Sequence, residues 1–579
     1  MRPQITGYLS TDKPWEKYYT KDALSHPIPQ CSVYSFLSHN SQRYLSNVAI
    51  NYYGRTISYK SLLMEIDKAT KAFLALGIKR GDIVTICSVN VPEVIYAFYA
   101  LNRIGAVSNM VDPRTNTDRI KQYMETAKSS IVLSLDRVLP RFIKMSENGM
   151  LERIIVLSPG DSLPFFLKVS YSLKNQKKKI ETNKFCISWQ EFINGGNNIG
   201  EIDIKPKYEK DYPATIVYTG GTTGIPKGAV LSNDSLNALT IEYSTNGMDY
   251  TPGQKFLNIM PPFIAYGVSC GLNMTLCIGL TNILIPQFDP EQFGELVMKY
   301  KPEHFIGVPS HFEKLISGRN AEKLDLSFVK TAAAGGDALV PESEERINRF
   351  FREHGCKYEI IKGYGMTELG SAAATTKDGA NKIGSVGIPL PRNIVSVRDI
   401  HTREELKCNQ EGELYMSSPT CMSTYINAPE ELKNVFWKDE KGIKWVKTGD
   451  IGYVDEDGFI FLKGRMKRMI IRPDGHNVWP SQIEAVIARH PAVEQCAVVG
   501  LPAPGTQNGQ IPTAFIVTKV GTEHSDHLLD DIEAFSKEQM PERDTASAFI
   551  FIDKMPMTNI GKVDFRTLEK IPLERKILK

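Results

Sequence analysis

A loop that could hold phosphate groups lies near the middle of the chain, where residues 218–228 read YTGGTTGIPKG after the run ATIV. Glycines let backbone N–H groups approach an anion closely, and a concave row of such groups binds phosphate. The threonine hydroxyls add donors, and the lysine adds a mobile positive charge for the outer phosphates. The candidate phosphate-binding residues are Thr219, Gly220, Gly221, Thr222, Thr223, Gly224 and Lys227.

The spacing of this loop differs from that of the P-loop in kinases and motor ATPases. Their GxxxxGK[ST] pattern places a glycine directly before the lysine. Here Pro226 occupies that position, before Lys227. The loop therefore indicates a nucleotide-binding protein of a different class.

Three further apolar runs end in turns that glycine or proline marks. Residues 305–308 lead into Pro309-Ser310, residues 329–334 into Gly335-Gly336-Asp337, and residues 358–362 into Gly363-Tyr364-Gly365. In open α/β sheets, ligands bind beyond the carboxyl ends of the strands. We therefore expect these turns and the phosphate loop to surround one nucleotide site.

The alternation of short apolar runs with helical patterns predicts an α/β fold. We expect a large N-terminal domain of α/β sheets with helices over residues 1–464. The charged sequence GRMKR then opens a second segment, with helices predicted at residues 481–490 and around 528–535 and strands at 496–500, 513–518 and 549–552. Residues 465–579 suffice for a small α+β domain.

The composition limits the class and location of the protein. The 579 residues are 42% hydrophobic and 23% charged, which is typical of a soluble globular protein. The formal net charge of +3 is too small to indicate a nucleic-acid partner. The nine cysteines stand singly, without a CxxC pair, which fits a reducing compartment. The N-terminus lacks a signal-peptide core and no apolar run is long enough to span a membrane, so we expect a cytoplasmic protein.

A lysine-rich segment, residues 164–184, begins with Pro164 and ends with Lys184. It reads PFFLKVSYSLKNQKKKIETNK, with two phenylalanines beside the lysine run. Charge runs are usually solvated, so we favour an exposed insertion loop. The alternative is a weak contact with a membrane surface.

The phosphate loop and the motifs downstream of it resemble those of the adenylate-forming superfamily, which includes acyl-CoA synthetases, peptide-synthetase adenylation domains and firefly luciferase. The resemblance runs from TISYKSLL at Thr56 to Lys562. It implies that the protein uses ATP, Mg²⁺ and coenzyme A, and that the small C-terminal domain is mobile.

The resemblance assigns roles to the GYGMTE motif of residues 363–368. Tyr364, next to Gly365, would stack on adenine, and Thr367 would bond the α-phosphate. Glu368 would help to hold Mg²⁺, a cation that prefers oxygen ligands.

Other motifs match the adenosine and hinge positions of the family. Gly335, Gly336 and Asp337 match the adenine-contacting turn, and Asp450 of the TGD sequence would accept hydrogen bonds from the ribose hydroxyls. Arg465 would also contact the ribose, and Lys467 would be the hinge, although Arg468 replaces the usual aspartate. Lys562, in PMTNIGKVD, matches the catalytic lysine.

The acyl pocket is expected at residues 261–267, PPFIAYG, where Ile264, Tyr266 and Gly267 match a stretch that lies over the substrate in the family. Val268 and the alanines at 332–334 would extend an apolar wall. Residues 261–277 contain no aspartate to pair with an amino acid's ammonium group, and burying an unpaired ammonium is costly. An amino-acid substrate is therefore disfavoured.

These observations predict a ligase that activates an apolar carboxylic acid, favouring a medium- or long-chain fatty acid, to acyl-AMP and transfers it to coenzyme A. Four alternatives remain open: an aryl acid as substrate, loading of a separate carrier protein, a luciferase-like oxygenase, and a nucleotide sensor without activity.

Overall fold

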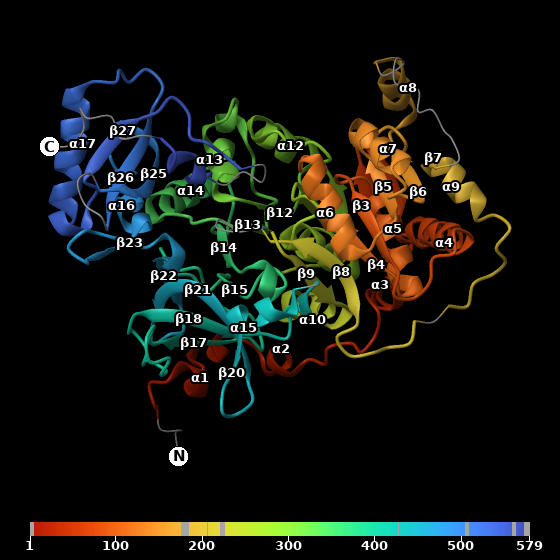
Figure 1. Ribbon diagram of the computed structural model, residues 1–579, viewed down its shortest axis with the longest axis horizontal. Helices are drawn as coiled ribbons and strands as arrows, with labels where there is room; N and C mark the ends of the chain where they lie inside the picture. Colours follow the sequence, from red (N-terminus) through yellow and green to blue (C-terminus); the bar gives the residue numbers. More distant parts are fainter. Residues whose placement is uncertain are drawn as a thin grey trace.

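Two large sheets form the body of the protein in the computed structural model, which describes residues 5–174, 185–204, 206–219, 226–426, 428–503, 509–558 and 563–571 (Figure 1). One sheet has the strand order β19-β9-β8-β4-β3-β5-β6-β7, and the other has the order β16-β15-β14-β13-β12-β10-β11-β1-β2. With the helices between their strands, they confirm the predicted α/β fold with a large N-terminal domain.

The strands of the eight-stranded sheet are β3 (Ile83–Cys87), β4 (Val107–Met110), β5 (Ile131–Leu135), β6 (Arg153–Leu157), β7 (Cys186–Ser188), β8 (Pro213–Tyr218), β9 (Gly228–Ser232) and β19 (Thr424–Tyr425). Those of the nine-stranded sheet are β1 (Val48–Tyr52), β2 (Arg55–Ser58), β10 (Lys255–Asn258), β11 (Thr281–Leu284), β12 (His304–Gly307), β13 (Thr331–Gly335), β14 (Ile361–Tyr364), β15 (Ala374–Thr375) and β16 (Ile388–Pro389).

Helices connect and cover these strands. They are α1 (Leu9–Asp12), α2 (Lys21–Ser25), α3 (Val33–Ser41), α4 (Tyr59–Ala75), α5 (Pro92–Ile104), α6 (Thr117–Ala127), α7 (Leu139–Glu147), α8 (Phe165–Lys174), α9 (Trp189–Gly195), α10 (Asn233–Thr245), α11 (Thr275–Ile278), α12 (Phe293–Tyr300), α13 (Pro309–Ser317) and α14 (Pro341–Glu353). Every residue of α5 is buried, and its apolar side chains share one core with residues of both sheets. A helix that is apolar on all sides is stable only in such an interior position.

The strands that position the nucleotide turns run parallel. β10, β12, β13 and β14 pair in parallel, in that order, so their carboxyl ends meet at one edge of the sheet. β8 pairs in parallel with β4 but antiparallel with β9, so the chain reverses at the phosphate loop between β8 and β9. The expected arrangement of turns at strand ends is therefore present.

A third sheet and a smaller unit complete the chain. The third sheet contains β17 (Ile394–Arg398), β18 (Gly412–Ser417), β20 (Phe436–Lys438), β21 (Lys444–Val454) and β22 (Ile460–Arg465), with α15 (Leu432–Val435) beside it. The smaller unit contains β23 (Ile470–Ile471), β24 (Asn477–Val478), β25 (Val493–Pro502), β26 (Gln510–Thr518), β27 (Ala548–Phe551), α16 (Pro480–Ile487), α17 (Asp526–Gln539) and α18 (Phe565–Leu568). The division at residue 464 stays a prediction.

The sequence interpretation was wrong about the local structure of the lysine-rich segment. Its first part forms α8 (Phe165–Lys174) rather than a loop, and this helix projects from the end of the molecule opposite to the small C-terminal unit (Figure 1). Residues 175–184 lie outside the described residues. No helix in the described part of the chain combines the length and apolar character needed to cross a bilayer.

Candidate active site

A cavity of about 2160 Å³ collects residues from the ends of β8, β12, β13, β14 and β22 and from the middle of β21. Twelve of the residues predicted for the site line it: Thr219, Lys227, Ile264, Tyr266, Gly335, Gly336, Tyr364, Gly365, Thr367, Glu368, Arg465 and Lys467. Segments that lie far apart in the sequence therefore meet around one space, as ligand sites at strand ends require.

Tyr364, Asp450 and Arg465 form one hydrogen-bonded group at the nucleotide end of this cavity. The Tyr364 hydroxyl donates to Oδ2 of Asp450 over 2.7 Å, and Nε of Arg465 donates to Oδ1 over 2.7 Å. Burial, together with the Asp450 charge, raises the pKa of Tyr364 well above its usual value, so this hydroxyl keeps its proton as a donor. Asp450 is only 6% exposed and lies behind the lining residues, where it orients both partners. Its contact with a ribose stays a prediction.

Glu368 is held by a tyrosine that the sequence analysis did not identify. The hydroxyl of the buried Tyr425, on β19, donates to Oε1 of Glu368 over 2.6 Å. Burial raises the pKa of Tyr425, and the charge of Glu368 raises it further, so Tyr425 remains a donor. Thr367 and Glu368 lie in a short 3-10 turn, Thr367–Leu369, that follows β14.

Lys227 also has a partner that no sequence motif indicated. Its Nζ lies 2.6 Å from Oε2 of Glu431 and 5.3 Å from the ring centre of Tyr425. The hydrogen bond from Lys227 lowers the pKa of Glu431, which is therefore ionised at neutral pH. Glu431 thus holds the lysine charge beside Tyr425, the residue that also donates to Glu368.

The two ends of the phosphate loop are fixed to each other. The Thr219 N–H donates to the Lys227 carbonyl over 3.0 Å, and the Lys227 N–H donates to Oγ1 of Thr219 over 3.1 Å. Residues 220–225 lie outside the described residues. The predicted phosphate-binding residues Gly220, Gly221, Thr222, Thr223 and Gly224 are therefore not placed, and their role stays a prediction.

Different structural constraints favour glycine at the two predicted adenine turns. A Cβ at Gly365 would lie 1.8 Å from the Ser371 carbonyl oxygen, so only glycine fits there. Gly336 has φ of +84°, a left-handed conformation that favours glycine. Asp337 is exposed and does not line the cavity; its Oδ1 accepts from the Ala338 N–H. The cavity therefore does not bring Asp337 together with the other residues predicted to bind the nucleotide.

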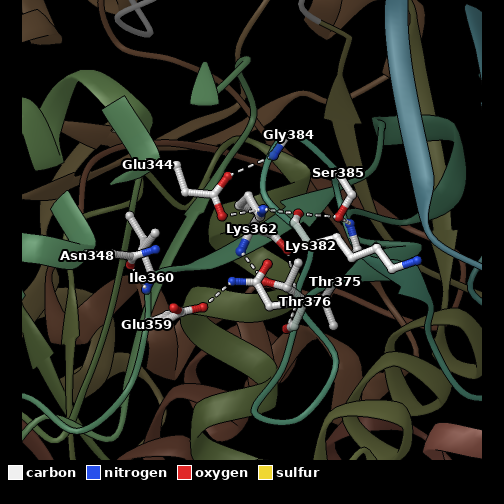
Figure 2. Close-up of polar contacts among 12 residues, drawn as sticks. Glu344, Asn348, Glu359, Ile360, Lys362, Thr375, Thr376, Lys382, Gly384 and Ser385 are labelled. Carbon is white, nitrogen blue, oxygen red and sulfur yellow. Dashed lines mark hydrogen bonds and ion pairs between the residues drawn. The ribbon is translucent and has the colours of Figure 1, made fainter. Parts of the chain in front are cut away.

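A buried ion pair anchors β14 directly before the GYGMTE turn. Lys362 is 4% exposed, and its Nζ lies 2.5 Å from Oε1 of Glu344 on α14 and 2.8 Å from the Lys382 carbonyl (Figure 2). The other oxygen of Glu344 accepts from the Gly384 N–H. Oγ1 of Thr376 accepts from the Lys362 N–H over 2.8 Å. These contacts hold β14 between α14 and the segment that follows β15.

The opposite end of the cavity is apolar. Its lining there comes from α10, β10, β12 and β14, from the residues that follow β10 and β11, and from the helical segment Tyr266–Met274. It includes Tyr243, Phe256, Met260, Tyr266, Met274, Ile285, Ile306 and Ile361. None of these side chains is charged. His311 borders the same region, and burial lowers its pKa to about 4, so it is neutral at pH 7. This end of the cavity therefore suits a hydrocarbon group.

Not every residue expected in the acyl wall faces the cavity. Ile264 and Tyr266 line it, but a Cβ at Gly267 would lie 1.6 Å from the Pro261 carbonyl oxygen, so Gly267 serves a close backbone approach instead. Val268 is in the core. Only Ala333 of the alanines at 332–334 lines the cavity, because side chains alternate between the two faces of β13.

The residues predicted to form the hinge lie where β22 ends. Arg465 is the last residue of β22, and Lys467 lies in the 3-10 turn Met466–Arg468; both line the cavity. Arg468 donates to Oε1 of Glu484 on α16 over 2.7 Å, so the unusual arginine contacts the small unit. Residues 559–562 lie outside the described residues, so Lys562 is not placed.

The donors near Glu368 fit the Mg²⁺ that the family uses. No group of three or more His, Cys, Asp or Glu side chains suited to a metal occurs among the described residues. Mg²⁺ in nucleotide enzymes is usually held by one or two carboxylates together with substrate phosphates. One carboxylate, that of Glu368, borders the cavity next to Thr367 in the sequence, which agrees with that pattern.

Comparison with known proteins identifies the family. The profile of the AMP-binding enzyme family matches residues 37–426, and that of the AMP-binding enzyme C-terminal domain matches residues 482–562. The chain is 28% identical to a long-chain-fatty-acid–CoA ligase of Bacillus subtilis (strain 168), over 97% of this chain and 98% of that protein. It is 27% identical to a 4-coumarate–CoA ligase-like protein of Arabidopsis thaliana, over 90% and 86% of the two chains.

A solved structure shares the fold. ATP-bound MatB from Rhodopseudomonas palustris superimposes with a TM-score of 0.78 at 22% identity, over 93% of this chain and 98% of that one. The family profile alone covers more than half of the chain, and the expectation of an AMP-forming ligase is confirmed at the level of this family. The protein therefore belongs to the AMP-binding enzyme family, as its resemblance to the adenylate-forming enzymes indicated.

Proposed function

We propose that the protein joins an apolar carboxylic acid to coenzyme A in two half-reactions, with a medium- or long-chain fatty acid favoured. In the first, a carboxylate oxygen bonds to the α-phosphorus of ATP as the bond to pyrophosphate breaks. In the second, the coenzyme A thiolate bonds to the acyl carbon as the bond to AMP breaks. The observation that carries the proposal is one cavity with a polar nucleotide end and an uncharged apolar end.

The residues at the nucleotide end would supply positioning and charge compensation, which phosphoryl and nucleotidyl transfer need more than a strong base. Tyr364, which donates a hydrogen bond to Asp450, would stack on adenine. Thr367 and Lys227, which line the cavity, would donate to phosphate oxygens, and Glu368 would hold Mg²⁺. When bound, Mg²⁺ neutralises phosphate charge.

The apolar end supports a hydrocarbon substrate over an amino acid. Its lining residues include no carboxylate that could pair with an ammonium group, and burying an unpaired charge is costly. The similarity to a long-chain-fatty-acid–CoA ligase over nearly the whole chain supports the fatty-acid reading. An aryl acid is the second candidate substrate, because the chain is also similar to a 4-coumarate–CoA ligase-like protein. The proposed cytoplasmic location agrees with nine free cysteines.

A panel of carboxylic acids tests the proposal. Pyrophosphate release and thioester formation would be measured with octanoate, palmitate and 4-coumarate, each with and without coenzyme A. We expect the fatty acids to give the higher kcat/KM and thioester to require coenzyme A. Higher kcat/KM for 4-coumarate would select the aryl alternative. Acyl-AMP that accumulates without transfer to coenzyme A would favour a carrier protein as acceptor.

A further inference from the structure

Helix α8 exposes an unusual run of apolar side chains. Phe165 is 75% exposed, Phe166 is 85% exposed and Val169 is 45% exposed. With Leu167, four large exposed apolar residues fall within five consecutive positions, whereas those elsewhere in the described chain are scattered. Scattered apolar residues are normal on a surface, but a contiguous group marks a site of interaction.

The other side of α8 is fixed to the protein. The Tyr171 hydroxyl donates to Oδ2 of Asp136 over 3.2 Å, and the tyrosine ring packs against Gly160. Just before the helix, the Ser162 hydroxyl donates to Oε1 of the buried Glu93 over 2.5 Å. The helix is therefore held by its inner face, which leaves the phenylalanines directed outward.

The inner face of the same helix borders the cavity. Leu167, Ser170 and Tyr171 are among the cavity-lining residues, as is Leu163 before the helix. At about 100° per residue, Leu167, Ser170 and Tyr171 fall on one side of the helix, and Phe165 and Val169 fall on the other. One short element thus contacts the cavity with one face and solvent with the other.

Basic side chains accompany α8, beside the carboxylates of Asp136 and Asp161. Lys168 is exposed beside the phenylalanines, and its Nζ donates to the Asp161 carbonyl over 3.1 Å. Arg137 is exposed at the cavity lining near Tyr171. The sequence of the segment adds Lys174, Lys177, Lys178 and Lys179. Aromatic and basic residues together suit a surface of anionic lipid headgroups over acyl chains.

We propose that α8 docks the protein on an anionic lipid bilayer, with Phe165, Phe166 and Val169 at the boundary between headgroups and acyl chains. Because the opposite face of α8 borders the cavity, the docked protein would receive an apolar acid directly from the bilayer. This second step rests on the proposed function, whereas docking itself does not.

Cosedimentation of the full-length protein with vesicles tests the docking. The vesicles would contain phosphatidylcholine alone or an equal mixture with phosphatidylserine. The helix variant is Phe165→Ser/Phe166→Ser, and the matched control is Met64→Ser/Val520→Ser, which changes two apolar residues exposed elsewhere. We expect wild type and control to bind the phosphatidylserine vesicles at low salt and less at high salt, because the attraction between charges is screened. The helix variant should bind at least about tenfold more weakly.

Three outcomes would overturn the proposal. One is the absence of wild-type binding to phosphatidylserine vesicles at low salt, and another is undiminished binding of the helix variant. The third is that the wild type is a dimer and the helix variant a monomer, while both bind vesicles equally. A second copy of the protein would then cover α8. Unchanged thermal unfolding of the helix variant would show that it is folded.

Measurements of rate and KM distinguish an effect on docking from an effect on catalysis. The helix variant should keep the wild-type rate with soluble octanoate, because Phe165 and Phe166 do not line the cavity. Its KM for palmitate supplied in phosphatidylserine vesicles should rise, whereas that of the control should not. An equal KM in both variants would contradict delivery from the bilayer. If wild type itself converts no acid but still binds vesicles, the proposed function fails and docking stands.

Discussion

Three charged side chains that line the cavity, Glu368, Lys227 and Arg465, each have a polar partner on another strand or segment. Tyr425 donates to Glu368, Glu431 pairs with Lys227, and Arg465 pairs with Asp450. Groups held in this way need little rearrangement when a transition state develops charge. The protein's own side chains thus hold these charges in position before a substrate phosphate binds.

At the residue scale, we predict that Glu368→Ala lowers the rate of acyl-AMP formation by about 10²–10³-fold without unfolding the protein. Glu368 lies on a turn after β14 and is not part of the apolar core, so its loss removes a cation ligand rather than packing. Tyr425→Phe, which removes only the hydroxyl that orients Glu368, should have a smaller effect. Pyrophosphate exchange measures both, and normal exchange in Glu368→Ala would reject the role assigned to this carboxylate.

At the scale of elements, β14 connects the stability of the fold to the position of the nucleotide turn. Its Lys362 is paired inside the protein with Glu344 of α14 (Figure 2). Its last residue is Tyr364. Burial lowers the pKa of Lys362, and the neighbouring Glu344 opposes that shift. A displacement of β14 would therefore move the aromatic ring at the adenine position.

We predict that Lys362→Met lowers the free energy of unfolding by about 3–5 kcal/mol, because it leaves the Glu344 charge buried without a partner. The double variant Lys362→Met/Glu344→Met should recover most of that loss. It should nevertheless raise KM for ATP more than KM for the acid, since β14 loses its polar anchor. Denaturant unfolding and separate KM measurements check the two parts. A double variant as unstable as the single one would argue against the ion pair as the cause.

At the scale of the whole molecule, the small C-terminal unit contacts the large one through side chains of opposite charge. Nε of Arg489 lies 2.6 Å from Oε1 of Glu342 at the start of α14, and both side chains are partly exposed. Exposed ion pairs contribute little to stability, so such a contact can be exchanged for another. That agrees with the prediction that the small unit is mobile.

We predict that Lys562→Ala loses acyl-AMP formation by about 10²–10³-fold yet still converts supplied acyl-AMP and coenzyme A to thioester. Lys467→Pro should show the converse, because proline restricts the hinge dihedral and hinders the rotation needed for the second step. Both half-reactions would be measured separately in both variants. Equal loss of the two steps in folded Lys562→Ala would refute a mechanism with two positions of the small unit.

The sequence by itself determined the fold class, the family and most of the loops at the site. Glycines, threonines and GYGMTE stand directly after β-branched runs, and such local patterns specify a strand and the turn that follows it. The predicted strands at residues 305–308 and 358–362 were displaced by one to three residues from β12 and β14, because local composition places ends only approximately. The phosphate loop interior and Lys562 lie outside the described residues, so their roles rest on motifs alone.

Only the tertiary structure decided which side chains meet. Tyr425 lies 57 positions from Glu368, and Glu431 lies 204 positions from Lys227, so no local pattern could connect them. Packing also decided that Ala333 alone of its neighbours faces the cavity, and that Gly267 serves a backbone contact. The lysine-rich segment predicted a loop, but its first part forms α8, with Tyr171 against Asp136 and Gly160 and the phenylalanines exposed. Which face a residue presents depends on distant partners, and those partners are brought together only by the folded chain.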